Sequence, residues 1–133
     1  MNQAIVTITV KSSIKEELID ITDLVDKAIS RGTVRDGVCI VYTSHTTAAI
    51  TINENADPAV ARDLLLGMKH FGLEKVSFAH MEGNSPAHVK SSIIGCSETI
   101  FVKGGSLVLG RWQGIFFCEF DGPRTRQVMV RLV

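Results

Sequence analysis

The sequence predicts an α+β fold: a mostly antiparallel β-sheet sandwich with about three helices. Two observations support this prediction. Helical patterns occur before Gly95, whereas residues 97–133 consist of strand-like runs and turns. The segment GIFFCEF, residues 114–120, is also apolar on both faces, so this strand must be covered on both sides. Helices can cover one face, and a second sheet or a neighbouring subunit must cover the other.

The first element is a strand, because residues 4–11 are rich in β-branched side chains. A helix follows, which Asp20 or Thr22 can cap and which runs to about Arg31. Its buried face is expected to consist of Leu24, Val25, Ala28 and Ile29. Gly32 is placed to end this helix.

A long extended segment comes next. Asp36-Gly37 predicts a turn, and the segment from 38 to 53 is then apolar or alternating throughout. Because a typical strand has about 5–6 residues, this segment should bend, and we expect the bend at residues 44–47. Such a bend would change the direction in which His45 points, which makes the segment a candidate wall of a functional site.

The second helix should begin at Asp57-Pro58, where a capping carboxylate precedes a proline at the first helical position. Its apolar side chains recur at helical spacing: Val60, Leu64, Met68 and Phe71. Gly72 follows, and we interpret residues 75–79 as a short strand.

A third helix is expected from Ser85-Pro86 to Gly95. Beyond it the sequence alternates between strands and turns, with strand-like runs at 97–103, 106–110, 114–120 and 125–133. Gly104-Gly105, between the first two of these runs, predicts a hairpin.

The composition limits the kinds of function. The 133 residues fit a single domain spanning 1–133, and 14 basic and 14 acidic residues give a net charge of zero. A nucleic-acid partner needs a positive surface, so none is expected. No long apolar run is present, so neither a membrane partner nor a signal peptide is expected. The three cysteines have no CxxC spacing, which predicts reduced thiols and a cytoplasmic protein.

Three of the four histidines are candidates for a site. His70 stands at the end of the second helix, where an imidazole suits the helix terminus, so we interpret it as structural. His45 lies at the expected bend, His80 in the loop HMEGNSP, and His88 in the first turn of the third helix. We expect these three to converge in one pocket, where they would share a metal ion or an anion.

Two further features could belong to the same pocket. The first turn of the third helix offers unpaired N–H groups, to which Ser85 and Lys90 could add a hydroxyl and a cation for an anion. Alternatively, Ser85 merely caps the helix and Lys90 is solvated. Glu119 lies within the apolar run GIFFCEF, where a carboxylate needs a partner or a metal. It could instead reach solvent at the strand end, or pair with Arg124 or Arg126.

The sequence resembles the YjbQ-like family, whose members carry the name secondary thiamine-phosphate synthase enzyme. Three segments carry the resemblance: SHTTAAITINENADP at 44–58, SPAH at 85–88 with Lys90, and LVLGRWQGIFFCEFDGPRTR at 107–126. The similarity extends from about residue 4 to the C-terminus. The matching motif residues are His45, Thr46, Asn53, Glu54, His88, Lys90, Trp112, Gln113, Glu119 and Arg124. The resemblance implies an α+β protein that forms a homotrimer.

It also implies an enzyme with weak thiamine-phosphate-synthase-like activity, which would join a pyrimidine pyrophosphate to a thiazole phosphate. The catalytic residues would be His45, His88 and Glu119. The residues expected to bind the phosphorylated small-molecule substrate are Thr46, Ser85, Lys90, Gln113 and Arg124. The metal ligands would be His45, His80 and His88.

The expected cofactor is a divalent metal. Three histidines suit zinc or another transition metal, whereas a pyrophosphate transferase would use Mg²⁺, which prefers oxygen ligands. Two alternatives remain open. One is a metal-assisted hydrolase of a phosphorylated small molecule, and the other is a module that binds a metal or an anion without turnover.

Overall fold

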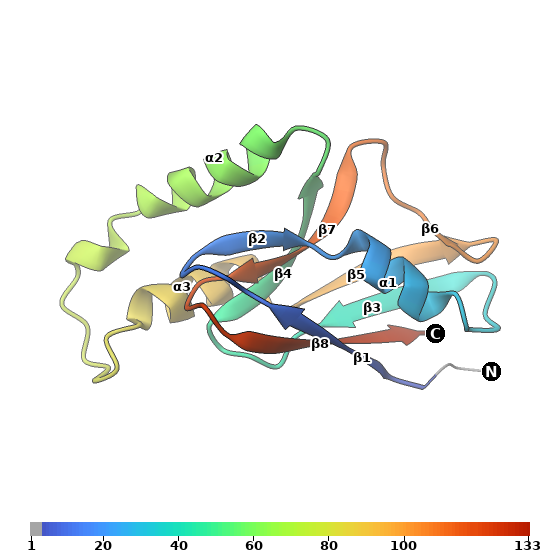
Figure 1. Ribbon diagram of the computed structural model, residues 1–133, viewed down its shortest axis with the longest axis horizontal. Coiled ribbons are helices and arrows are strands. Elements are labelled where there is room, and N and C mark those ends of the chain that lie inside the picture. Colours follow the sequence, from blue (N-terminus) through green and yellow to red (C-terminus); the bar gives the residue numbers. More distant parts are fainter. Residues whose placement is uncertain (1–3) are drawn as a thin grey trace.

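A computed structural model describes residues 4–133, and its strands form two antiparallel sheets (Figure 1). The larger sheet has the order β1-β8-β3-β5-β6, with bounds Val6–Lys11, Thr125–Leu132, Gly37–Tyr42, Ser97–Lys103 and Ser106–Leu107. The smaller sheet has the order β2-β7-β4, with bounds Glu17–Asp20, Gln113–Glu119 and Ala48–Glu54. The helices are α1 (Thr22–Ile29), α2 (Pro58–Lys69) and α3 (Ser85–Ile94). The predicted α+β class is confirmed.

The three-stranded sheet lies between the five-stranded sheet and two helices. Ile115 and Phe117 of β7 belong to the main core, which β1, β3, β5, β8 and α1 also form. Cys118 and Phe120 belong to a second cluster, which Met68 of α2 and Ala87 of α3 complete. Both apolar faces of β7 are therefore covered within the chain. The apolar strand does not require a neighbouring subunit, and the homotrimer stays a prediction.

The expected starts of α2 and α3 are confirmed. The Asp57 carboxylate accepts a hydrogen bond from the Ala59 N–H at 2.9 Å and caps α2, with Pro58 at its first position. Helix α3 begins at Ser85 and is followed by Gly95, whose φ of 101° an L side chain rarely adopts. Among residues 4–133, no helix is long and apolar enough to cross a membrane.

Helices α1 and α2 bury less than the apolar patterns predict. Helix α1 ends at Ile29, two residues before Arg31; the Ser30 hydroxyl donates to the Lys27 carbonyl at 2.7 Å, and the Gly32 N–H donates to the Ile29 carbonyl at 2.9 Å. Leu24 on α1 is 42% exposed. On α2, Met68 is buried, whereas Phe71 is 54% exposed because the helix ends at Lys69, two residues before it.

The strand expected at residues 75–79 is wrong. Gly72 adopts φ 72° and leads into a 3₁₀ turn, η1 (Leu73–Lys75), after which the chain continues without strand pairing. The alternation of Val76 and Phe78 resembles a strand, but β2 and β4 already occupy both sides of β7. Strand β2 was not predicted, because its charged neighbours and its position at the sheet edge hide its pattern.

The bend predicted at 44–47 is confirmed. Strand β3 ends at Tyr42 in the five-stranded sheet, and β4 begins at Ala48 in the three-stranded sheet. The linking residues are fixed at both ends: the Thr43 hydroxyl donates to the Gln127 carbonyl at 3.0 Å, and the Thr47 carbonyl accepts from the Phe120 N–H at 3.2 Å. The chain therefore changes sheets at the point where it presents His45.

The three cysteines should differ in reactivity towards iodoacetamide. All are free; Cys39 and Cys118 are buried, and Cys96 is exposed. Burial raises the pKa of the Cys39 thiol to about 11, and burial, with a smaller effect of the Glu98 charge, raises that of Cys118 to about 12. Mass spectrometry of the native protein should therefore find Cys96 modified first. Equal modification rates for all three thiols would contradict the burial of Cys39 and Cys118.

Candidate functional site

The three candidate histidines line one cavity at the end of β7, where the β3–β4 link meets the loop before α3. The cavity has a volume of about 410 Å³. Its side chains include His45, His80, His88, Thr46, Arg124 and Arg126. We call it the histidine pocket. The structure thus brings together residues that are widely separated along the chain.

One hydrogen bond fixes the tautomer of His45. Its Nε2 accepts a hydrogen bond from the Gln127 backbone N–H at 2.9 Å, so the neutral ring carries its proton on Nδ1. Burial lowers the pKa of His45, and the Arg126 charge lowers it further. At neutral pH the imidazole is therefore uncharged, with an N–H group available from Nδ1.

His80 and His88 form an edge-to-face pair beside it. Their ring centroids are 5.3 Å apart and the ring planes make an angle of 85°. His80 comes from the loop before α3 and His88 from the first turn of this helix. His70 lies outside the pocket, as predicted, and its Nδ1 contacts the Leu66 carbonyl oxygen at 3.0 Å.

Glu119 lies beneath the pocket, fully buried, and does not line it. Its Oε1 accepts from the Ser12 hydroxyl at 2.6 Å and from Arg126 Nε at 2.9 Å. Its Oε2 accepts from Arg126 Nη2 and from the Asp121 N–H, the latter at 3.1 Å. Burial alone would raise the pKa of Glu119, but the hydrogen bonds from Arg126, Ser12 and Asp121 outweigh it and lower the pKa.

This pairing makes Glu119 a support for Arg126. Both carboxylate oxygens are occupied, so neither is left for a metal or for a proton transfer in the pocket. Arg126 is on the pocket wall, and its Nη2 also donates to the Thr47 hydroxyl at 2.9 Å. The geometry thus favours the pairing alternative over direct catalysis by Glu119, whose catalytic role stays a prediction.

The turn after β7 supplies a second, more accessible guanidinium. Arg124 is half exposed and donates from Nε to the Asp121 carbonyl at 2.8 Å and from Nη2 to the Asp121 carboxylate at 3.0 Å. The same carboxylate accepts from Asn84 Nδ2 at 2.9 Å, which joins the turn to the start of α3. A Cβ on Gly122 would lie 2.3 Å from the Ile14 carbonyl oxygen, so the turn is closely packed.

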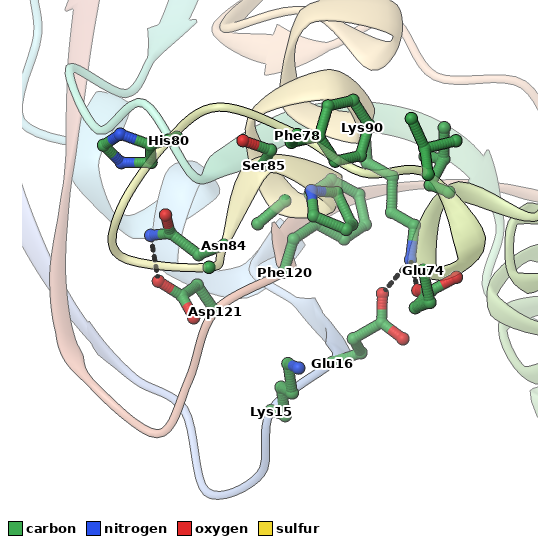
Figure 2. A pocket seen from close by; sticks show the side chains of 15 residues that line it. Lys15, Glu16, Glu74, Phe78, His80, Asn84, Ser85, Lys90, Phe120 and Asp121 are labelled. Carbon is green, nitrogen blue, oxygen red and sulfur yellow. Dashed lines mark hydrogen bonds and ion pairs between the residues drawn. The ribbon is translucent and has the colours of Figure 1, made fainter.

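Ser85 and Lys90 line a neighbouring cleft and do not line the histidine pocket (Figure 2). Lys90 is buried, and its ammonium group contacts Glu16 at 2.6 Å and Glu74 at 3.3 Å. Two carboxylates therefore already compensate the charge that the sequence suggested for anion binding. The structure places the Lys90 ammonium group, itself buried, against two partly exposed carboxylates and not on a solvated surface.

Replacing Lys90 by Met should leave anion binding in the histidine pocket intact. The ammonium group is bonded to Glu16 and Glu74, so its loss removes no donor from that pocket. Calorimetry should give an affinity for inorganic phosphate within about twofold of the wild-type value. A tenfold loss in a folded variant would show that Lys90 contacts the anion.

Gln113 lies at the other end of the small sheet. The register pairs Glu54 with Gln113 and Ala48 with Glu119, so six residues, or about 20 Å at ~3.3 Å per residue, separate Gln113 from the pocket end. The Gln113 side-chain oxygen accepts from the Gly110 N–H at 2.8 Å. Trp112 and Asn53 lie near the same distant end. One chain does not bring these residues to the histidines, and a role for Gln113 in the site stays a prediction.

The donor set does not fit zinc. Across residues 4–133, no group of three His, Cys, Asp or Glu is arranged to hold a metal ion. A metal-bound histidine usually donates its second N–H, whereas His45 accepts at Nε2 and keeps its proton on Nδ1. Mg²⁺ fits better, because one or two carboxylates and the substrate's phosphates usually bind it. Glu82 and Asp121 line the pocket; Asp121 Oδ2 already accepts from Arg124 and Asn84, so Glu82 and Asp121 Oδ1 are the oxygens that would bind Mg²⁺.

Sequence reasoning did not assign Arg126 to the pocket, although a signal was present. Arg126, Val128, Val130 and Leu132 alternate along β8 and are all buried. An arginine on the inward face of a strand needs an anionic partner, and Glu119 is that partner. Asp121, Asn84 and Glu82 left no comparable signal, because the loops that carry them have no periodicity.

The chain closely resembles known proteins in sequence and structure. The family described as UPF0047 protein YjbQ-like matches residues 6–133. A UPF0047 protein of Methanocaldococcus jannaschii is 52% identical over 93% of this chain and 90% of its own length. YugU of Bacillus subtilis is 45% identical over 96% of this chain and 97% of its own length.

Solved structures show the same fold. A YjbQ/UPF0047 family protein of Clostridium acetobutylicum has a TM-score of 0.93 at 48% identity, covering 96% of this chain and 99% of that one. A YbjQ-like protein of Sulfolobus solfataricus P2 has a TM-score of 0.93 at 32% identity, covering 99% of this chain and 98% of that one.

Proposed function

This chain belongs to the UPF0047 YjbQ-like family, and we propose that its histidine pocket is the active site of an enzyme that acts on a phosphorylated small molecule. The observation that carries the proposal is the state of His45. Its Nε2 is occupied by the Gln127 N–H, which leaves a neutral Nδ1–H donor in a pocket that also contains Arg124. Hydrogen-bond donors and guanidinium groups are the groups that bind phosphate oxygens.

Each pocket residue has a defined part in this proposal. Arg124 supplies charge, because half of its side chain is exposed and its remaining N–H groups are free to reach a phosphate. Thr46 adds a hydroxyl. His80 and His88 are the candidates for proton transfer, because their rings lie together in the pocket and an imidazole can act as a general acid or base.

We propose thiamine phosphate formation, which the resemblance implies, as the first reaction to test. The pocket would bind the departing pyrophosphate, and Mg²⁺ held by Glu82 and Asp121 would offset its charge. The alternative of a metal-assisted hydrolase has less support. A zinc ion would need a third protein ligand beside His80 and His88, and His45 Nε2 is already occupied by the Gln127 N–H. A module that binds an anion without turnover would use the same residues as the enzyme. The two alternatives differ only in whether the activity screen below detects a product.

A broad screen of the purified protein tests this proposal. Pyrimidine pyrophosphate with thiazole phosphate, and a set of phosphate esters, would be supplied with Mg²⁺ or Zn²⁺, and released pyrophosphate and phosphate would be measured. Turnover of at least one compound supports an enzyme. Saturable phosphate binding without turnover favours the binding module, and absence of both contradicts the proposal.

We also propose a homotrimer in the cytoplasm. The trimer rests on the resemblance and on exposed aromatic side chains, such as Phe101 at 72% and Trp112 at 53%. Light scattering at micromolar concentration should give three times the chain mass of 14.5 kDa. A mass of one chain would contradict the trimer. In a trimer, the distant end that carries Gln113 could meet the pocket of a neighbouring subunit.

A further inference from the structure

A second cavity adjoins the histidine pocket (Figure 2). One part of its lining is polar and another part is apolar. Its volume is about 260 Å³, and it shares His80, Asn84 and Asp121 with the histidine pocket. Its apolar wall consists of Leu73, Val76, Phe78, Pro86, Ala87 and Phe120. We call it the phenylalanine cleft. Because both cavities use the same three residues, one molecule could occupy both.

We propose that the phenylalanine cleft holds a flat apolar body, about one aromatic ring in size, of the molecule whose anionic group occupies the histidine pocket. This inference rests on the proposed function and adds the substrate class: a phosphate ester of an aromatic or similarly flat apolar group. It assigns recognition of the anion and of the apolar body to separate cavities.

The charges in the cleft argue against a second anion site. Lys90 is compensated by Glu16 at 2.6 Å and Glu74 at 3.3 Å. The remaining ionisable groups in the lining, apart from His80, are Lys15 and Asp121, so acids are at least as numerous as bases. The lining therefore has no excess of positive charge that would bind a phosphate. An uncharged ring does not need such an excess and is not repelled by the acidic groups.

Part of the apolar wall of the phenylalanine cleft is exposed to water, and a bound ligand would cover it. Val76 is 50% exposed and Phe78 is 38% exposed, whereas Phe120 behind them is buried. Concave apolar surface in contact with water is typical of ligand sites, because a ligand removes it from water. An apolar cavity of about 150 Å³ holds benzene, so 260 Å³ is sufficient for a substituted ring.

Calorimetry with inorganic phosphate and phenyl phosphate tests the inference. The wild-type protein should bind phenyl phosphate about tenfold more tightly, since the ring is removed from water. Phe78→Ala should abolish most of this difference and leave the affinity for inorganic phosphate unchanged. Val76→Ser should reduce the difference by a smaller factor. Phe71→Ala, which changes an exposed phenylalanine just after α2 and outside the cleft, is the matched control and should retain it.

The outcomes separate the two proposals. Equal affinity of the wild type for both probes, or a Phe78→Ala variant that retains the full difference, overturns the cleft assignment and leaves the phosphate site standing. Equal weakening of both probes by Phe78→Ala also overturns it, since that result places the effect on the phosphate. If the wild type binds neither probe, the proposed function and this inference both fail.

Discussion

Glu119→Gln is expected to lower the free energy of unfolding by about 3–5 kcal/mol. Glutamine keeps the shape of the side chain but leaves the buried guanidinium of Arg126 without a compensating charge. The Ser12 hydroxyl and the Asp121 N–H also lose the carboxylate to which they donate. Urea unfolding at neutral pH, followed by circular dichroism, would measure the loss.

The same substitution should change the response to acid. The unfolded carboxyl titrates near its ordinary pKa of 4.5, and the folded pKa of Glu119 is lower. The stabilisation is therefore present above pH 4.5 and is lost as the pH falls from that value through the folded pKa. Stability should decrease less steeply in Glu119→Gln than in the wild type below pH 4.5.

A matched control is Glu17→Gln, which changes a carboxylate bonded to Ser13 near the surface. It should cost less than about 1 kcal/mol. A loss of similar size in both variants would contradict a special contribution from the buried pair. The double variant Glu119→Gln, Arg126→Met should recover part of the loss, because it removes the uncompensated charge.

His45→Ala is expected to reduce turnover of any substrate found in the screen by about 100-fold or more, as loss of one preorganised hydrogen-bond donor does. The substitution removes the Nδ1–H donor and leaves the Gln127 N–H without its acceptor. Phosphate affinity should fall as well, since the pocket loses a hydrogen-bond donor. Steady-state kinetics and calorimetry on the same preparations would measure the two effects separately.

His70→Ala provides the matched control for this prediction. His70 lies at the end of α2, outside the pocket, and its ring contacts one backbone carbonyl. Its loss should leave turnover and phosphate affinity close to the wild-type values. Wild-type turnover in His45→Ala, or an equal loss in both variants, would contradict the assignment of the histidine pocket.

The elements with local signals could be predicted from the sequence. Asp57-Pro58 and Ser85-Pro86 begin helices because a cap or a proline acts within one turn. The strand expected at 75–79 failed for a nonlocal reason: alternation permits a strand, but pairing needs a free sheet edge beside it. Strand β2 is the opposite case. Its sequence pattern does not indicate a strand, but its residues pair with β7.

The site could be predicted in part for the same reason. His45, His80 and His88 stood out by residue type and by their positions at a bend, in a loop and in the first turn of a helix, and the structure places them in one cavity. The pairing of Glu119 with Arg126, seven residues away, was one of the alternatives that the sequence left open, whereas the more distant partners of the buried charges could not be read from the chain. Lys90 is paired with Glu16, 74 residues away, and Glu119 with Ser12, 107 residues away. Such distant contacts leave no periodicity in the sequence.

The protonation state of His45 is the most direct test of the proposed anion site. Long-range ¹H–¹⁵N NMR of the imidazoles at neutral pH should show His45 in the Nδ1–H form, with an unprotonated Nε2 that accepts from Gln127. Addition of inorganic phosphate should shift the Nδ1 resonance of His45 and leave the signals of His70 in place. An Nε2–H form of His45, or saturable phosphate binding that leaves its Nδ1 signal unchanged, would contradict the account.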